Sequence, residues 1–444
     1  MTLTLLAYGM VIAFMALIMT KRMSPITALI LVPIAFGLAG GFAPQLGEMM
    51  VAGIIKLAPT GVMLMFAILY FAVMIDAGLF EPFVHRLVAL VHGDPMKVVV
   101  GTAVLALLVS LDGDGSTTYM ITTAAMLPLY RKLGMRPLIL ACVTMLSGGV
   151  MNILPWGGPT ARAASSLSID VSTVFVPFIP AIVCGAAWVL FVSYRLGLGE
   201  RRRLGVAGPS SDANEAVLHE ELVNPDFVPD TDHRRPDRLL VNAVLTAVLL
   251  VALVAALLPL PVLFMIGFAI AVLVNYPTIE QQKALLSRHA GNAMAVVGLI
   301  FAAGIFTGIL SGTKMVDAMA DSVIRLVPDA LGPYLAIVTG VLSVPFTFFI
   351  SNDAFYFGVL PILAKAGQAY GITAAEMARA SLVGQPVHLL SPLVPSTFLL
   401  VGLAGVDFDD HQRFTLKWAL GSVVVLLLVG LVTLVIPLVG RTTG

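Results

Sequence analysis

The sequence predicts an all-α polytopic membrane protein with two inverted repeats, each containing a re-entrant hairpin and a discontinuous transmembrane helix. Of the 444 residues, 59% are hydrophobic and only 11% are charged, and the mean hydropathy is +1.00. A soluble core cannot absorb so much apolar sequence. In addition, one long apolar segment in each half of the chain is interrupted by polar residues. Matching interruptions of this kind predict an internal duplication.

Runs of about 17 to 25 apolar residues are long enough to cross a bilayer. In the first half they predict crossings at residues 3–20, 26–41, 51–77, 137–168 and 172–195. In the second half they predict crossings at residues 239–257, 260–276, 291–311, 377–406 and 412–437. We expect the first run to be a retained span and not a signal peptide, because Lys21 and Arg22 follow it and no positive region precedes it.

Two other segments, residues 97–130 and 331–364, are apolar at both ends and polar in the middle. Each is too long for one span, so we expect re-entrant hairpins whose polar tips lie near the middle of the membrane. Charged and apolar residues alternate in the two segments that precede the hairpins, 79–94 and 314–327. These segments predict interfacial helices that join a framework to a moving part.

The polar segment 199–238 separates the two halves and predicts a cytoplasmic linker between a first repeat, 1–198, and a second repeat, 239–444. With the N-terminus outside, lysine and arginine favour the cytoplasmic side by roughly three to one, as the positive-inside rule requires. The protein is therefore expected in the inner (plasma) membrane. The run from Arg201 to Arg203 is either a topogenic charge or a patch for lipid headgroups.

The first hairpin contains two carboxylates, Asp112 and Asp114, which alternate with Gly113 and Gly115. A charged side chain at the centre of a bilayer costs roughly 2.5–3.5 kcal/mol, so such residues predict function. An offset of about 237 positions aligns residues 114–116 with Ser351-Asn352-Asp353 in the second hairpin, and one residue of slippage later Asn152 aligns with His388. The aligned positions occur in the same order in both halves, which supports the duplication.

Glycine and proline are dense at residues 148–159 and 384–396, inside two predicted spans. Such stretches cannot continue a helix, so each span should consist of two half-helices. A half-helix that starts in mid-membrane points unpaired N–H groups and the positive end of its dipole into the protein. Four such starts, two at hairpin tips and two at broken spans, predict an anion-binding site.

The motifs at Leu111–Thr117, Asn152–Arg162 and Ser351–Tyr356 resemble those of the citrate-metal:proton symporters (CitMHS) of the ion transporter superfamily. The resemblance covers nearly the whole chain except the linker. It implies proton-driven uptake of citrate complexed with a divalent metal. It also implies a homodimer in which a scaffold supports a transport domain that moves as an elevator. Nothing in the residue spacing by itself indicates citrate.

The resemblance places Asn152, Ser351 and Asn352 where related divalent-anion transporters hold carboxylates and cations. The alternative is that these side chains only cap half-helices. The full set expected to bind substrate is Ser116, Thr117, Asn152, Gly157, Gly158, Thr160, Arg162, Ser351, Asn352, His388, Ser391 and Ser396. Asp112, Asp114 and Asp353 offer the oxygen ligands that Mg²⁺ and Ca²⁺ prefer, and they can equally carry a coupling proton.

Two further side chains, Arg162 and His388, each have more than one possible role. Arg162 is the one arginine placed within a span; it either clamps a substrate carboxylate or forms an internal salt bridge with Asp112, Asp114 or Asp353. His388 is either a proton carrier, a metal ligand or a hydrogen-bonded packing residue.

Several function classes fit the sequence poorly. A net charge of zero gives no basic surface for nucleic acid, and Cys142 and Cys184 suggest neither a disulfide framework nor a thiolate site. An intramembrane aspartyl protease would need a Gly-x-Gly-Asp motif, which is absent, so we expect no enzyme and no permanently bound cofactor. A channel would not need two duplicated gates. The alternative function is transport of another organic anion, a dicarboxylate or gluconate, coupled to sodium or protons.

Overall fold

The computed structural model describes residues 3–91, 93–113, 115–205, 234–255, 257–326, 328 and 330–441. Asp114 and most of the predicted linker, residues 206–233, lie outside the described residues. Within the described ranges all regular structure is helical, as predicted. Seven of the described helices are long and apolar enough to cross a membrane: Leu46–Asp76, Pro95–Asp112, Val171–Arg203, Pro236–Val254, Ile279–Gly312, Gly332–Phe349 and Phe408–Val432.

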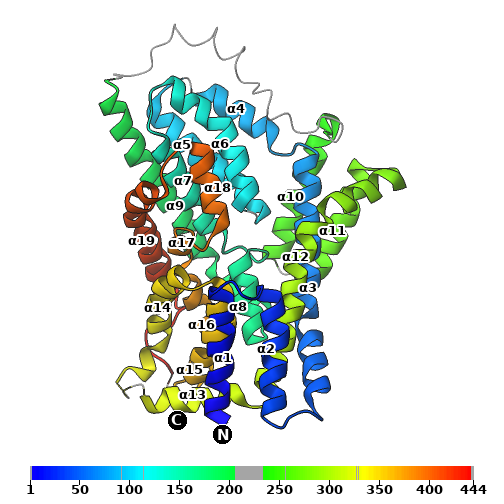
Figure 1. Cartoon of the computed structure of the whole chain (residues 1–444). Helices are drawn as coiled ribbons and strands as arrows, with labels where there is room; N and C mark the ends of the chain where they lie inside the picture. Colours follow the sequence, from blue (N-terminus) through cyan, green and yellow to red (C-terminus); the bar gives the residue numbers. More distant parts are fainter. Residues whose placement is uncertain are drawn as a thin grey trace.

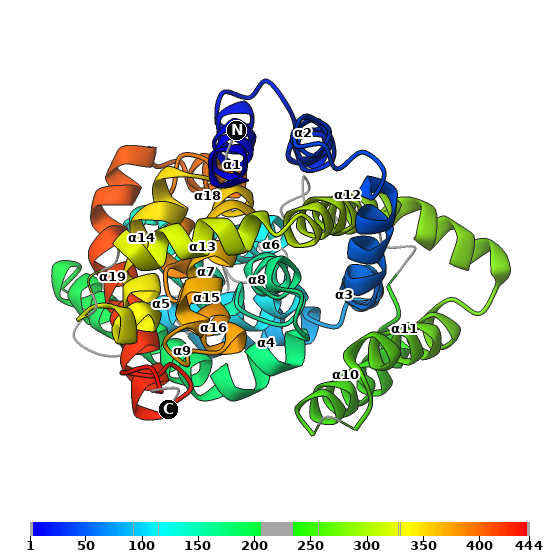
Figure 2. The ribbon, with the colours of Figure 1, turned by 90° about the horizontal axis from the view of Figure 1, so that it is seen from below.

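Five helices form one side of the molecule, which we call the wall (Figure 2). They are α2 (Pro25–Ala39), α3 (Leu46–Asp76), α10 (Leu239–Val254), α11 (Leu260–Asn275) and α12 (Ile279–Gly312). Helix α3 packs along α12 and α11, and α2 packs on α12. The contact between α3 and α12 is very close, because a Cβ atom on Gly53 would lie 1.9 Å from the carbonyl oxygen of Gly304. Backbones approach this closely only where both helices carry glycine.

The two predicted hairpins are present in the rest of the molecule, which we call the body. The first consists of α5 (Pro95–Val109), the short η1 (Ser110–Asp112) and α6 (Gly115–Lys132). The second consists of α14 (Leu335–Phe349), the π-helix η6 (Ala354–Val359) and α15 (Leu360–Gln368). Figure 1 shows α5 and α6 in the upper half of the molecule and α14 and α15 in the lower half. The hairpins therefore enter from opposite faces.

Both predicted broken spans are interrupted where glycine and proline gather. The first is α7 (Pro137–Met151) followed by α8 (Gly158–Leu167), and the second is α16 (Ala374–Leu382), α17 (Gln385–His388) and α18 (Pro395–Ala404). Each new half-helix starts with proline in its first turn, where the missing N–H has no cost. The wall contacts the body at these central elements, since α3 touches η1 and α8 and α12 touches α8.

The remaining helices complete the predicted order. They are α1 (Leu3–Met19), α4 (Glu81–Val91), α9 (Val171–Arg203), α13 (Met315–Leu326) and α19 (Phe408–Val432), with short turns η4 (Pro236–Arg238) and η5 (Gly332–Tyr334). Helices α4 and α13 are the short segments expected before the hairpins. Helix α9 continues to Arg203, so residues 199–203 are helical and do not belong to an irregular linker. Both ends of the described chain lie at the lower face in Figure 1.

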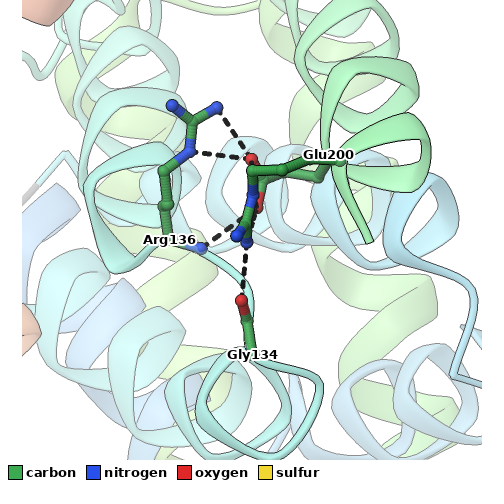
Figure 3. Close-up of polar contacts among 4 residues, drawn as sticks. Gly134, Arg136 and Glu200 are labelled. Atoms are coloured by element: carbon green, nitrogen blue, oxygen red, sulfur yellow. Dashed lines mark hydrogen bonds and ion pairs between the residues drawn. The ribbon is translucent and has the colours of Figure 1, made fainter. Parts of the chain in front are cut away.

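A buried carboxylate explains why α9 is longer than expected. Glu200 lies beyond the predicted span, is fully buried, and accepts hydrogen bonds from the backbone N–H and Nε of Arg136 and from Arg203 (Figure 3). Arg203 also donates to the carbonyl of Gly134 at 2.6 Å. Burial by itself would raise the pKa of Glu200, but the hydrogen bonds from Arg203 and Arg136 outweigh burial and lower it. The end of α9 thus holds the turn between α6 and α7.

Candidate functional site

A cavity of about 320 Å³ lies at the centre of the body, where the hairpin tips meet the broken helices. Its lining includes eight of the residues predicted for the site: Asn152, Gly158, Arg162, Ser351, Asn352, Asp353, His388 and Ser396. These eight residues come from three separate stretches of the chain, 152–162, 351–353 and 388–396, and from both repeats. The tertiary fold therefore gathers the polar residues that the sequence distributes over about 250 positions.

Four helix starts face this cavity. Gly115 begins α6, Gly158 begins α8, Ser351 precedes η6, and Pro395 begins α18, and all four line the cavity. The first turns of helices carry N–H groups without intrahelical partners, together with the positive end of the helix dipole. The arrangement has the geometry of the predicted anion-binding site.

An ion pair links the two repeats inside the cavity. Arg162 on α8 donates from Nε to Oδ1 of Asp353, with a separation of 2.6 Å. The side chains are 24% and 13% exposed, so both groups are largely removed from solvent. Among the described residues, Asp353 is the predicted partner that pairs with Arg162. No described residue accepts a hydrogen bond from the two Nη atoms of Arg162, which keep their donors for the cavity.

The tip of the second hairpin, residues 350–353, is tied to α17 by a partly buried amide pair. Asn352 and Gln385 exchange two hydrogen bonds, of 3.3 and 3.2 Å. Gln385 also donates to the hydroxyl of Tyr356 at 2.8 Å. Gln385 and Tyr356 are both fully buried. Because each amide satisfies the other, this pair fixes the tip in one position.

His388 and Ser391 attach the helix before this tip to the same broken span. Nδ1 of His388 lies 2.6 Å from the carbonyl oxygen of Thr347, which is an acceptor only, so Nδ1 carries a proton and donates. No described residue bonds to Nε2 of His388. The hydroxyl of Ser391 donates to the carbonyl of Phe348 at 2.6 Å. His388 lines the cavity, whereas Ser391 has the role of a structural anchor.

The tip of the first hairpin, residues 110–115, is contacted by Trp156 in the break between α7 and α8. The indole N–H donates to the carbonyl of Leu111 at 2.8 Å. Gly113 has a φ of +78°, and a Cβ atom there would lie 2.7 Å from the indole ring. Glycine is therefore required both for the turn and for the close approach. The other side of the indole packs against Phe71 of α3 and Phe264 of α11 in the wall.

Several residues predicted for the site do not line the cavity. Ser116 and Thr117 lie in the first turn of α6, and Asp112 is buried at the end of η1, 7% exposed. The Thr160 hydroxyl donates to the Ile153 carbonyl across the break in the span. A Cβ atom on Gly157 would lie 2.0 Å from the carbonyl oxygen of Asn152, so this glycine is required by the turn. Asp114, which was also predicted for the site, lies outside the described residues.

Sequence reasoning missed residues that the structure places at the site. Gln385 and Trp156 hold the two tips, and Ser110, Thr118 and Tyr119 line the cavity. A buried glutamine in a predicted span was a usable signal, because an amide at membrane depth needs a partner. The described residues contain no group of three or more His, Cys, Asp or Glu side chains placed to hold a metal.

Comparisons with known proteins agree with this architecture. The chain is 58% identical to a citrate transporter of Bacillus subtilis (strain 168), over 97% of this chain and 100% of the relative. It is 51% identical to the Mg²⁺/citrate complex secondary transporter of the same organism, over 97% of this chain and 98% of the relative.

Two solved structures share the fold. The YdaH transporter of Alcanivorax borkumensis superposes with a TM-score of 0.56 at 15% identity, covering 90% of each chain. MtrF of Neisseria gonorrhoeae gives 0.62 at 13% identity, covering 92% of this chain and 88% of that one. The first is named as a transporter and the second is assigned to a class of antimetabolite efflux pumps. The model of the citrate transporter family matches residues 14–384. The chain therefore belongs to the CitMHS family of citrate transporters.

Proposed function

We propose that this protein transports citrate as its complex with a divalent cation of the Mg²⁺ or Ca²⁺ class, together with protons. The observation that carries the proposal is that one cavity presents both an arginine with free Nη donors and the carboxylate of Asp353. A metal–citrate complex has matching parts, because it presents carboxylate oxygens and a partly neutralised cation. The 51% identical relative that is named for the Mg²⁺/citrate complex supports this assignment.

The carboxylates of citrate would be held by Arg162 and by the four helix starts. The cation would be approached by the oxygen of Asp353 and by the amide oxygens of Asn152 and Asn352, since hard divalent cations take oxygen ligands. Citrate supplies the other ligands of the metal, so the protein does not need a complete coordination shell. A cavity of about 320 Å³ suits a small ligand.

Proton coupling would use groups that are already at the site. Asp353 and His388 line the cavity, and Asp112 lies just behind it in η1. Ionisable side chains at membrane depth are typical of proton pathways in transporters. The absence of net charge and the presence of these titratable groups favour protons over sodium.

Transport would follow an elevator movement of the body against the wall. The body carries the whole cavity lining, while the wall contacts the body where α2 packs on α1, where α3 and α12 touch α8, and where Phe264 of α11 meets Trp156. The close glycine contact between α3 and α12 makes the wall a rigid support. The exposed apolar faces of α10 and α11, with Leu240 77% and Leu273 65% exposed, are available to lipid and to the second copy of the proposed homodimer.

The upper face of Figure 1 would lie in the cytoplasm and the membrane would be the plasma membrane. Arg131, Lys132, Arg202 and Arg203 are exposed near this face, where α6 and α9 end. Positive residues collect on the cytoplasmic side of membrane proteins. The linker between α9 and η4, and thus residues 206–233, would be cytoplasmic as well.

Uptake of labelled citrate into proteoliposomes tests the proposal. We expect uptake to stop when a chelator removes divalent metal and to return when Mg²⁺ or Ca²⁺ is restored. An imposed inward proton gradient should accelerate uptake without sodium. Uptake that is unchanged by the chelator would refute the metal complex as substrate. Strict sodium dependence at constant pH would favour the alternative function, transport of another organic anion.

Asp112→Asn keeps the shape of a buried side chain and removes its charge, and it should abolish uptake if the first tip takes part in coupling. Asp170→Asn is a matched control, because Asp170 caps α9 at the exposed surface. Each variant is compared by uptake per amount of monodisperse protein. Normal uptake by Asp112→Asn would exclude this residue from coupling.

A further inference from the structure

The ion pair between Arg162 and Asp353 has a consequence for which substrates the cavity accepts. Among the described residues that line the cavity, Arg162 is the one lysine or arginine. Its Nε is bound to Asp353 at 2.6 Å, so its charge already neutralises a carboxylate of the protein. Its Nη atoms have no acceptor among the described residues. The ion pair is thus neutral, and its guanidinium can still donate hydrogen bonds.

A citrate carboxylate that reaches the Nη atoms would share the same guanidinium charge with Asp353. Both side chains are largely buried, at 24% and 13% exposure, and a carboxylate in such surroundings needs a full counter-charge. Two carboxylates around one guanidinium leave one negative charge without compensation. Metal-free citrate therefore meets repulsion where its carboxylate would bind.

We propose that Asp353 is the residue that makes binding depend on the metal, because the divalent cation of the complex replaces Arg162 as its counter-charge. Arg162 is then released to the citrate carboxylate, and both charges remain compensated. This inference rests on the proposed function and deepens it. This role differs from that of an ordinary metal ligand. Replacing a residue that only binds the metal should abolish binding of the complex. Replacing a charge that repels free citrate should allow citrate to bind without metal.

The second tip is suited to the substitution that separates these roles. Asparagine at position 353 keeps an oxygen that can accept from Nε of Arg162 and removes the negative charge. The neighbouring contacts do not involve the 353 side chain, since Asn352 pairs with Gln385 and the Ser351 hydroxyl accepts from the backbone N–H of Ala354. We therefore expect Asp353→Asn to keep the tip in place.

The test measures citrate binding to purified protein by calorimetry, with Mg²⁺ and with a chelator. Wild type should bind citrate with Mg²⁺ and bind at least about tenfold more weakly in chelator. Asp353→Asn should bind citrate in chelator about as tightly as with Mg²⁺. Asp317→Asn is the matched control, because it also removes a carboxylate from an ion pair, with Lys365 at 3.0 Å, but outside the cavity. This control should keep the metal requirement of the wild type.

The outcomes separate the two proposals. If wild type binds citrate equally well in chelator, the proposed function is wrong. If wild type needs Mg²⁺ and folded Asp353→Asn needs it by the same factor, or binds no citrate at all, the inference on Asp353 is wrong. Asp353→Ser provides a second neutral variant with a smaller side chain. If neither variant folds, the carboxylate is a structural requirement and the inference is rejected.

Discussion

The two hairpin tips occupy equivalent places in the two repeats, but they are fastened to different neighbours. The second tip is bound within the body, through the amide pair of Asn352 with Gln385 and the ion pair of Asp353 with Arg162. The first tip touches Trp156, whose ring rests on Phe71 and Phe264 of the wall. The difference indicates that the second tip shapes the binding site, whereas the first tip is also linked, through Trp156, to the position of the body relative to the wall.

The largest effect is expected from breaking the amide pair at the second tip. Gln385→Leu removes the partner of the Asn352 amide and the donor to the Tyr356 hydroxyl, and a buried polar group without a partner costs about 1–3 kcal/mol. We expect uptake to fall by about tenfold or more and the thermal midpoint to fall as well. Gln45→Leu is the control, because Gln45 is exposed and its side chain makes no capping bond to α3. An equal loss in both variants would contradict the role of the pair.

A smaller effect is expected at the first tip. Trp156→Phe removes the donor to the Leu111 carbonyl but keeps an aromatic ring against the wall, so the loss should be about 0.5–1.5 kcal/mol. Uptake should slow by about two- to tenfold while citrate affinity stays the same. Trp188→Phe removes a similar indole bond, to the Trp418 carbonyl at 3.2 Å, far from the tips. If both variants slow uptake equally, the hydrogen bond from Trp156 to the first tip has no specific role in transport.

The contact of Trp156 with the wall can be weakened without touching its hydrogen bond. Phe264→Leu removes a ring that meets the indole edge to face at 5.1 Å, and such aromatic pairs contribute about 0.5–1.5 kcal/mol. We expect uptake to slow by about twofold to fivefold. Phe268→Leu is a close control, since this ring also belongs to α11 but packs on Phe66 of α3, within the wall, at 5.5 Å. A larger loss of uptake in Phe268→Leu would show that uptake depends on packing within the wall and not on the contact between Phe264 and Trp156.

The smallest effect on uptake is expected at the turn that follows the first hairpin. The pKa of Glu200 is lowered in the folded protein, so its contribution to stability is complete above its ordinary pKa of 4.5 and is lost as the pH falls through the folded value. Glu200→Gln should lower the thermal midpoint at pH 7, and its difference from wild type should shrink as the pH falls below 4.5. A difference that grows with acid would contradict this sign.

The control for that measurement is Glu81→Gln, because the Glu81 carboxylate is 36% exposed in its pair with Arg234. An exposed ion pair contributes little to stability, so the control should change the thermal midpoint at pH 7 much less than Glu200→Gln does. Uptake per folded molecule should stay near wild type in both variants.

The second repeat has a related arrangement, in which Glu376 caps α16 and pairs with Arg441.

The sequence by itself determined the helices, the two hairpins and the two broken spans. Hydropathy fixes which segments enter a bilayer, and the glycines and prolines at 148–159 and 384–396 fix where a helix cannot continue. These are local properties of the chain. The same reasoning anticipated that Asn152, Arg162 and Asn352 would face one site. The end of α9 was misplaced because its last turn depends on a distant partner, Arg136.

Only the tertiary structure decided which groups pair. The sequence allowed Arg162 three carboxylate partners, and the choice of Asp353 depends on how α8 lies against the second tip, 191 residues away in the chain. Gln385 and Trp156 gain their roles in the same way, from contacts between repeats and between body and wall. Such contacts depend on packing over long sequence separations, and no local propensity encodes them.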